Sequence, residues 1–332
     1  MEIGKKITAL AHPNIALVKY WGKRQKRGNL PAVGSISITL DTLYSRTTLT
    51  LDPSLSSDVF YLNGAPGPEN QQRRVQTFLD LFRQRSGQQV FARVDSENNF
   101  PTAAGLASSA SGFAALAVAA NRAFQLDLSP RELSMIARQG SGSAARSIFG
   151  GFVEMHAGED PDGSDAFAEP LLPPEAWPLH VVICITSTSE KDIGSTEGME
   201  RTASTSPFYE AWVQASVKDL AEMRQALLAR DFEKLAEISE HSCLKMHGLA
   251  MSARPGIVYW NGTTVELMHH IRRLRHQGIP VFFTIDAGPQ VKAICLPEAL
   301  EQVRRELGGI PGVHRLFITG LGKEARIIED DS

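Results

Sequence analysis

The spacing of hydrophobic residues predicts a chain that changes repeatedly between helices and strands. Residues 69–86 place apolar side chains at the i, i+3, i+4 and i+7 positions of an amphipathic helix. An Ala-rich segment without a helix breaker begins at Phe113 and predicts a second helix. Helical spacing or a helix start signal predicts the remaining helices at 130–139, 208–229, 231–246, 263–276 and 297–307.

Short β-like runs predict the strands. They occupy residues 5–11, 35–51 with a candidate turn at Asp41-Thr42, 59–62, 88–96, 180–187, 279–286, 290–296 and 313–319. Asn63-Gly64 is a strong hairpin-turn signal after the 59–62 run. Residues 157–178 are rich in Asp, Gly and Pro, which predicts an exposed loop and a domain boundary. The closing strands and helices indicate an α+β layer.

Composition narrows the class of protein. The chain has 332 residues, 42% of them hydrophobic and 21% charged, which suits one large globular domain or two domains. Its net charge of −3 gives no global electrostatic case for a nucleic-acid partner. Cys184, Cys243 and Cys295 form no CxxC or Cys/His pattern, which argues against structural zinc and a disulfide framework. Without a signal-peptide run or an apolar stretch of about 20 residues, we expect a soluble cytoplasmic protein with no membrane partner.

The chain is organised around residues 96–124, which join a polar segment to the Ala-rich helix. The run from Ala103 to Ala107 is small enough for a ligand to approach the backbone. The hydroxyls of Ser108, Ser109 and Ser111 stand where a helix leaves its first N–H groups unpaired. Such a helix start favours phosphate, because the N–H donors and the helix dipole act together. A plain N-capped core helix fits the local chemistry equally well.

A second run of small polar residues lies at 140–151. Four of them precede Arg146, and Gly150-Gly151 follows it. An Arg side chain can hold a carboxylate or a phosphate in a bidentate fork, whereas an ordinary surface turn with a solvated Arg is the alternative. Residues 191–199 repeat the Gly-Ser-Thr chemistry beside Lys191.

Asp286 is the most suggestive carboxylate in the sequence. It follows an apolar β run and immediately precedes Ala287-Gly288-Pro289. A carboxylate held there can orient a hydroxyl or accept its proton, although an Asx-type turn is the better local interpretation. His12, His269 and His270 lie outside any HExxH pattern, so we interpret them as structural or solvated.

Five runs of this sequence carry a family resemblance. They are NIALVKYWGKR (14–24), SENNFPTAAGLASSASGFAAL (96–116), ARQGSGSAARSIFGG (137–151), STEGM (195–199) and TIDAGPQ (284–290). PTAAGLASSA resembles the superfamily of galactokinase, homoserine kinase, mevalonate kinase and phosphomevalonate kinase. KYWGK, GSGSAARS and DAGP together resemble its diphosphomevalonate decarboxylase branch, from about residue 5 to about residue 320.

The resemblance implies an α+β fold with two domains and an active site in the cleft between them. The N-terminal domain, residues 1–187, is expected to be ribosomal-S5 domain-2-like and to bind ATP. The C-terminal domain, residues 188–332, is expected to be ferredoxin-like. The implied reaction is the ATP-dependent decarboxylation of mevalonate 5-diphosphate to isopentenyl diphosphate, through phosphorylation of the 3-hydroxyl. A homodimer is also implied.

The resemblance also assigns roles to individual residues. Asp286 is the implied catalytic carboxylate, Lys19 its basic neighbour, and Arg146 the ligand of the substrate carboxylate and reacting phosphoryl region. The implied substrate contacts are Tyr20, Lys23, Ser141, Ser143, Arg146 and Ser195. The implied ATP contacts are Ser96, Asn98, Gly105, Ala107, Ser108 and Ser109. Magnesium is expected to bridge ATP oxygens, and no protein ligands for it are evident.

Several positions depart from the family pattern. Ala32-Val33-Gly34 replaces a common Asn or Ser pair, Gln25 replaces a frequent acidic residue, and Gln290 replaces the commoner Asn after DAGP. Thr196 stands where some members place an Arg near the diphosphate. Relatives that act on mevalonate 5-phosphate, or only phosphorylate a mevalonate 3-hydroxyl, are therefore the second hypothesis. A catalytically silent nucleotide- or metabolite-binding protein on the same fold is a third.

Overall fold

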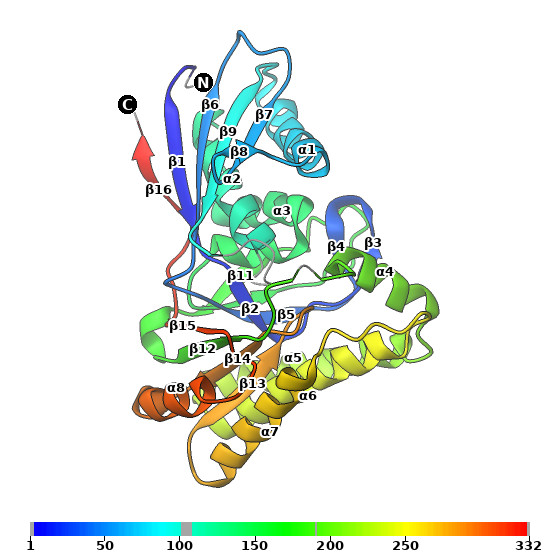
Figure 1. The fold of residues 1–332 in the computed structure, drawn as a ribbon. Helices are drawn as coiled ribbons and strands as arrows, with labels where there is room; N and C mark the ends of the chain where they lie inside the picture. The colour runs from blue at the N-terminus through cyan, green and yellow to red at the C-terminus, as the bar shows by residue number, and fades with distance from the viewer. Residues whose placement is uncertain (1–2, 101–107, 190, 331–332) are drawn as a thin grey trace.

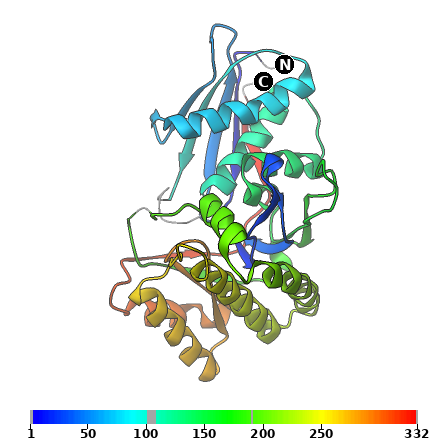
Figure 2. The same ribbon diagram turned by 90° about the vertical axis from the view of Figure 1, so that its right-hand side faces the viewer.

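Residues 3–100, 108–189 and 191–330 are described by a computed structural model. They form two halves, with the N-terminal half above the C-terminal half in Figures 1 and 2. The helices in these residues are α1 (Glu69–Ser86), α2 (Ser108–Ala123), α3 (Pro130–Gly140), α4 (Ser195–Thr205), α5 (Tyr209–Ala229), α6 (Phe232–Met251), α7 (Gly262–His276) and α8 (Leu300–Gly308). Short 3-10 helices are η1 (Arg27–Asn29), η2 (Gly142–Ile148), η3 (Pro174–Ala176) and η4 (Pro297–Ala299). None of the helices in these residues is long and apolar enough to cross a membrane.

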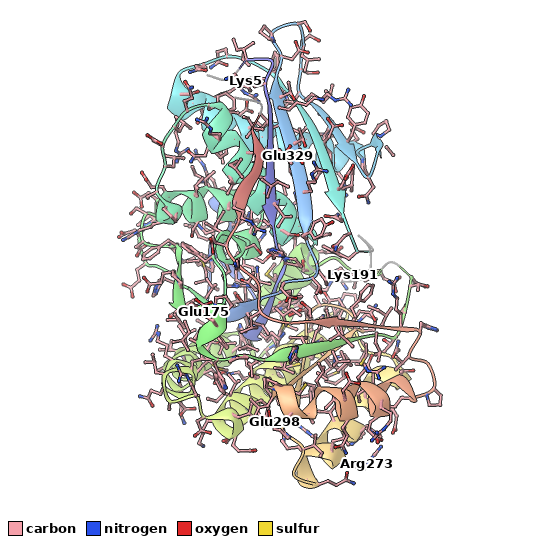
Figure 3. The ribbon with its side chains drawn as sticks, turned by 90° about the vertical axis from the view of Figure 1, so that its left-hand side faces the viewer. Lys5, Glu175, Lys191, Arg273, Glu298 and Glu329 are labelled. Atoms are coloured by element: carbon pink, nitrogen blue, oxygen red, sulfur yellow. The ribbon has the colours of Figure 1, made fainter. Side chains whose placement is uncertain are left out.

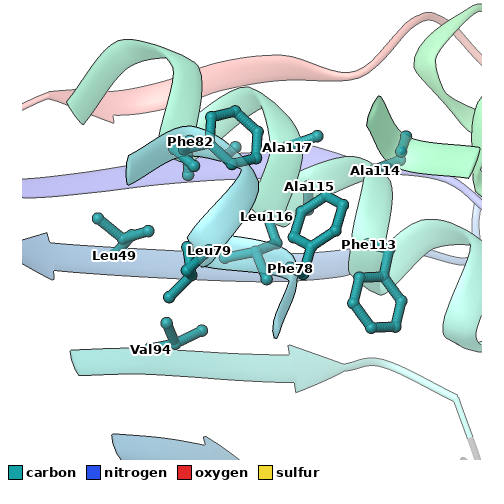
Figure 4. Close-up of a cluster of buried hydrophobic side chains, with 14 of the residues drawn as sticks. Leu49, Phe78, Leu79, Phe82, Val94, Phe113, Ala114, Ala115, Leu116 and Ala117 are labelled. Carbon is teal, nitrogen blue, oxygen red and sulfur yellow. The ribbon is translucent and has the colours of Figure 1, made fainter. Parts of the chain in front are cut away.

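A six-stranded sheet forms the outer part of the N-terminal half. Its order is β16 (Arg326–Asp330), β1 (Lys6–Ala11), β6 (Ser45–Leu51), β9 (Ala92–Asn98), β7 (Val59–Leu62) and β8 (Ala65–Pro66). Burial alternates along β6 and β9, because α1 and α2 cover one face of the sheet only. Figure 4 shows Phe78, Phe82 and Phe113 packed over Leu49 and Val94 in this core. The small Ala side chains of α2 let that helix lie close to the strands.

A four-stranded sheet lies between the outer sheet and the C-terminal half. Its order is β11 (Ala168–Leu172), β10 (Phe152–Met155), β5 (Ser35–Thr39) and β2 (Asn14–Val18). All residues of β2 and β5 are buried, so both faces of these strands are covered. The hairpin of β3 (Lys23–Gln25) and β4 (Leu30–Pro31) projects from the same region (Figure 1).

The C-terminal half contains a four-stranded antiparallel sheet with helices packed on it. Its order is β13 (Val281–Ile285), β14 (Val291–Cys295), β12 (His180–Ile185) and β15 (Arg315–Thr319). In chain order, β12 leads through helices to β13 and β14, and α8 then leads to β15. This β-α-β-β-α-β succession is the ferredoxin-like arrangement that we predict for the C-terminal domain.

Hydrogen bonding crosses the predicted domain boundary at residue 187 in two places. β12 precedes that boundary, yet it pairs with β14 and β15 of the C-terminal sheet. β16 follows it, yet it pairs with β1 of the N-terminal sheet. Each of these two strands therefore belongs to the sheet on the other side of the predicted boundary.

Most predicted elements are confirmed, and the structure differs from the prediction at a few places. Residues 157–178 are not simply a loop, because β11 and η3 lie within them. Ser195 begins helix α4, where we expect only a polar cradle. The predicted helix 297–307 is divided into η4 and α8. Ser111 does not face a ligand site: it is buried and its hydroxyl bonds to that of Ser45, 2.7 Å away.

Candidate active site

The Asp286 carboxylate lies between two buried lysines. Its Oδ1 accepts a hydrogen bond from Lys19 Nζ at 2.7 Å, and its Oδ2 lies 3.3 Å from Lys292 Nζ. The two lysines are 1% and 2% exposed, whereas Asp286 is 27% exposed. Burial raises the pKa of the Asp286 carboxyl, but Lys19 and Lys292 outweigh this effect and bring the pKa well below its ordinary value. The carboxylate is therefore ionised and has one side open to a ligand.

Secondary structure brings these three groups together from distant parts of the sequence. Lys19 directly follows β2, and Asp286 directly follows β13. Lys292 lies on β14 opposite Thr284, two residues before Asp286, so the two side chains project from the same face of the sheet. The Lys19–Asp286 ion pair therefore joins the middle sheet to the C-terminal sheet.

Arg146 is a further buried cation, and neutral groups hold it. Its Nε and Nη2 donate to Asn14 Oδ1 at 3.2 and 3.0 Å, and its Nη1 lies 2.5 Å from Ser35 Oγ. It is 2% exposed and forms no ion pair with a carboxylate of the described residues. Burial lowers the pKa of Arg146 to about 10, so the guanidinium stays charged at neutral pH. Such a charge favours an anionic ligand.

Tyr20 lies beside Arg146 and has an unsatisfied hydroxyl. The Arg146 guanidinium carbon is 5.9 Å from the centroid of the Tyr20 ring. The Tyr20 hydroxyl oxygen is buried without a hydrogen-bond partner among the described residues. A Cβ at Gly142 would lie 2.2 Å from this oxygen, so the glycine is needed for the ring to fit. Burial raises the pKa of Tyr20 to about 12, and the hydroxyl is therefore a neutral donor.

Three serine hydroxyls connect the start of α2 to the segment that carries Arg146. Ser141 is the last residue before η2, and its Oγ lies 3.2 Å from Ser109 Oγ and 3.4 Å from Ser143 Oγ. Hydroxyls can act as donors or acceptors, so this row can bind phosphate oxygens. These contacts place the 96–124 and 140–151 segments side by side.

A pocket of about 100 Å³ opens beside the start of α2. Its apolar walls are Phe60, Leu62, Val75, Val94, Phe113 and Leu116. Four of the predicted ATP contacts, Ser96, Asn98, Ser108 and Ser109, supply part of its polar lining. Arg74 also lines the pocket, with its guanidinium 4.9 Å from the centroid of the Phe113 ring. The pocket therefore combines apolar walls with hydroxyls and a cation, a chemistry suited to part of a nucleotide.

Other predicted site residues lie apart from these contacts or outside the described residues. Lys23 is half-buried on β3, and burial lowers its pKa. Ser195 is exposed at the first position of α4, which lies against β3 (Figure 2), and no hydrogen bond joins it to another predicted site residue that the structure describes. Gly105 and Ala107 lie outside the described residues. Lys191, labelled in Figure 3, donates to the Ala287 carbonyl oxygen at 3.0 Å, next to Asp286.

Sequence reasoning missed Lys292 and Asn14. Lys292 is the charged residue in the otherwise apolar run Val291–Cys295, and a lysine in a buried strand implies a nearby carboxylate. Asn14 begins the apolar strand β2, and its side chain is buried. A buried polar residue inside an apolar strand was the available signal in both cases.

The fold and the site define an α+β enzyme that handles phosphates and a further anionic substrate between two halves. Residues 11–168 match the diphosphomevalonate decarboxylase-like N-terminal domain, and residues 181–310 match the mevalonate 5-diphosphate decarboxylase C-terminal domain. The chain therefore belongs to the diphosphomevalonate decarboxylase family, which confirms the predicted family, enzyme class and α+β fold class.

Individual relatives agree with this assignment over nearly the whole chain. A diphosphomevalonate decarboxylase from Candida albicans is 38% identical over 337 residues, covering 95% of this chain and 93% of that protein. A solved structure of MDDEF in complex with MVAPP, AMPPCP and magnesium is 42% identical with a TM-score of 0.91, covering 98% of this chain and 99% of that one. The structure of mevalonate diphosphate decarboxylase from Staphylococcus aureus is 36% identical with a TM-score of 0.92 and covers 98% of each chain.

Proposed function

We propose that this protein converts mevalonate 5-diphosphate and ATP into isopentenyl diphosphate, ADP, phosphate and carbon dioxide. The observation that carries the proposal is the pair of opposite charges in one site. Asp286 is an ionised carboxylate with an open side, and Arg146 is a buried guanidinium with no carboxylate partner among the described residues. The first suits a reacting hydroxyl, and the second suits the carboxylate of the same substrate.

Asp286 acts on the 3-hydroxyl of the substrate. Lys19 and Lys292 keep its carboxylate ionised and fix its direction, so it accepts a hydrogen bond from the hydroxyl and aligns the oxygen for attack on the terminal phosphoryl group of ATP. Because the pKa of Asp286 is well below its ordinary value, the carboxylate is a weak base. Orientation and electrostatic stabilisation therefore form its larger contribution.

Arg146 acts in the decarboxylation. When phosphate leaves, positive character develops on the tertiary C3 atom. The bond between C2 and the carboxylate carbon then breaks, and its electron pair forms the new double bond as carbon dioxide leaves. Arg146 holds the carboxylate in position for this step, and Asn14 and Ser35 hold Arg146. The remaining substrate contacts, Tyr20, Lys23, Ser141, Ser143 and Ser195, bind the diphosphate end as donors.

ATP and magnesium fit the residues beside this site. The pocket at the start of α2 suits the nucleotide, and the Ser109, Ser141 and Ser143 hydroxyls are hard oxygen ligands of the type that magnesium prefers. Among the described residues, no group of three or more His, Cys, Asp and Glu side chains could hold a metal ion. This composition suits a cation bound mainly by ATP oxygens, where it neutralises phosphate charge.

Gly112→Leu is expected to raise the KM for ATP at least about 10-fold without loss of stability. Gly112 lines the pocket, and a Cβ added there meets nothing within 4 Å, so a larger side chain starts from open space and extends into the pocket. Steady-state kinetics and a thermal melt measure the two effects. Gly248→Leu is the matched control, since Gly248 is another helical glycine with open space around its Cβ position. An unchanged KM for ATP in Gly112→Leu would place the nucleotide elsewhere.

Tyr20→Phe is expected to keep or raise the melting temperature while lowering kcat/KM for mevalonate 5-diphosphate about 10-fold. The Tyr20 hydroxyl is buried without a partner among the described residues, so its removal relieves an unpaired polar group. A hydrogen bond to a charged group contributes about 1.5–3 kcal/mol, which is the affinity that the substrate loses. Calorimetry and kinetics measure both quantities. A destabilised variant with unchanged kinetics would contradict a role in substrate binding.

A product assay tests the reaction itself. Mevalonate, its 5-phosphate and its 5-diphosphate are each supplied with ATP and magnesium, and ADP and carbon dioxide are measured separately. We expect both products with the 5-diphosphate. ADP without carbon dioxide would identify a kinase, preference for the 5-phosphate would identify the second decarboxylase, and binding without turnover would identify a silent protein.

We also propose a homodimer, a cytoplasmic location and a refined domain boundary. The dimer rests on family resemblance, and sedimentation measurements test it. Three free, buried thiols support a reducing compartment.

The domain boundary is better placed before β12 than at residue 187, with β16 assigned to the N-terminal domain, because strand pairing follows that division.

A further inference from the structure

The strand that carries Asp286 lies at the edge of its sheet. β13 pairs with β14 on one side, and no other strand of the described residues pairs with it on the other side. An edge strand has backbone N–H and C=O groups without a strand partner. All five residues of β13 are nevertheless buried, so these groups need other partners.

Side chains from one face of α6 are these partners. Glu240 Oε1 accepts a hydrogen bond from Phe283 N–H at 3.4 Å. Cys243 Sγ accepts one from Ile285 N–H at 3.2 Å and is 3.5 Å from the Ile285 carbonyl oxygen. His247 Nε2 lies 3.3 Å from the same carbonyl oxygen. The spacing i, i+3 and i+7 puts the three side chains on one helix face, and they replace a missing neighbouring strand.

The same helix also holds Lys19. Ser242 Oγ accepts a hydrogen bond from the backbone N–H of Lys19 at 3.0 Å. Lys19 follows a strand of the middle sheet, whereas Asp286 follows a strand of the C-terminal sheet. Helix α6 contacts both strands, so it fixes the backbone positions from which the Lys19 and Asp286 side chains extend. A direct bond from Thr284 Oγ1 to the Ala16 carbonyl oxygen, 3.2 Å long, supports the same junction.

Both groups that hold Ile285 are neutral. Burial lowers the pKa of His247 to about 3, and Lys19 adds to this effect, so the ring has a single N–H to donate to the carbonyl oxygen. The ring is fixed by Trp260, whose centroid is 4.7 Å away. Burial raises the pKa of the Cys243 thiol to about 11, so it remains protonated. Neutral partners add no charge that would compete with Lys19 and Lys292 for Asp286.

From these contacts we infer that Ser242, Cys243 and His247 are positioning residues that set the geometry of the Lys19–Asp286 pair through the backbone. The inference rests on the proposed role of Asp286. Ile285 immediately precedes Asp286, so a change in its backbone direction moves the carboxylate. Displacement of a reacting group by about 1 Å lowers a rate by up to about 10²-fold.

The test compares removal of the two contacts to Ile285 with their conservative replacements. Cys243→Ala and His247→Leu remove the bonds to Ile285, whereas Cys243→Ser and His247→Gln keep a polar group within reach. We expect the first pair to lower kcat about 10-fold or more with the KM for ATP unchanged, and the second pair to recover most of the rate. Cys295→Ala is the matched control, because Cys295 is a buried thiol in the same sheet with no hydrogen bond among the described contacts.

Two results would overturn the inference. The first is that Cys243→Ala and His247→Leu have the same kcat as Cys295→Ala. This comparison is made per folded molecule, with the folded fraction determined from thermal melts. The other is a loss that Ser and Gln fail to recover although both variants fold. Asp286→Asn distinguishes this failure from failure of the proposed function: if that variant keeps turnover, the role of Asp286 is wrong. If it loses turnover, adding Cys243→Ala should lower the residual rate no further.

Discussion

Asp286→Asn is expected to lower turnover about 10³-fold while the protein still binds ATP. The amide keeps the shape of the side chain but removes the negative charge that faces the substrate hydroxyl. It also leaves Lys19 and Lys292 close together without the carboxylate that separates their charges. The ATP pocket is built from α1, α2 and the outer sheet, so its affinity for nucleotide should change little. Turnover with mevalonate 5-diphosphate and equilibrium binding of ATP measure the two properties.

Asp219→Asn is the control for the loss of a buried ion pair. Asp219 accepts a hydrogen bond from Lys245 at 2.6 Å, and both side chains are largely buried between α5 and α6. Both variants should lose stability, yet Asp219→Asn should keep its turnover per folded molecule. Near-normal turnover in Asp286→Asn would mean that another group orients the 3-hydroxyl.

The sequence was sufficient to predict some of the elements that carry the site, because their signals are local, whereas β2 before Lys19 and η2 around Arg146 were not predicted. The helix over residues 69–86 and the strand before Asp286 follow from side-chain periodicity. The motif resemblance supplied Asp286, Lys19 and Arg146, and the structure brings the first two into contact. Lys292 has a local signal as the charged residue of an apolar strand, but that signal does not identify its partner. Its role depends on the register of β13 against β14, which one strand alone does not specify.

The parts that could not be predicted depend on contacts between distant segments. β16 is a strand because β1 has a free edge more than 300 residues earlier in the chain. β12 belongs to the C-terminal sheet because β14 and β15 form on both sides of it. The contact between Cys243 and Ile285 likewise requires α6 to lie along an edge strand. In each case the placement of a segment depends on the distant segment that it contacts, so its own sequence does not determine that placement.

The site also explains why a polar network can exist inside a core. Arg146 donates hydrogen bonds to Asn14 and Ser35, and all three residues are buried, which requires nearly complete satisfaction of their donors and acceptors. Tyr20 is the member whose hydroxyl has no partner in the described residues. A buried network with an unsatisfied donor and an uncompensated positive charge is costly for a purely structural core. It is consistent with a site that is completed by an anionic substrate.

Arg146→Lys is expected to lower kcat/KM for mevalonate 5-diphosphate at least about 10²-fold, even though the positive charge is kept. A lysine has no planar fork, so it cannot bond to Asn14 and Ser35 while also presenting two parallel donors to a carboxylate. Carbon dioxide release should fall at least as far as ADP release, because the carboxylate is then held less well.

Arg83→Lys separates this effect from the general cost of changing a buried arginine. Arg83 is 3% exposed and is paired with Asp58 at 2.7 Å in the outer part of the N-terminal half. Its replacement should reduce the melting temperature and leave the ratio of carbon dioxide to ADP at one. If Arg146→Lys also kept that ratio and near-normal kcat/KM, the substrate carboxylate would have to bind elsewhere. A ratio well below one in Arg146→Lys alone would assign Arg146 to the decarboxylation step, because phosphoryl transfer would then proceed without it.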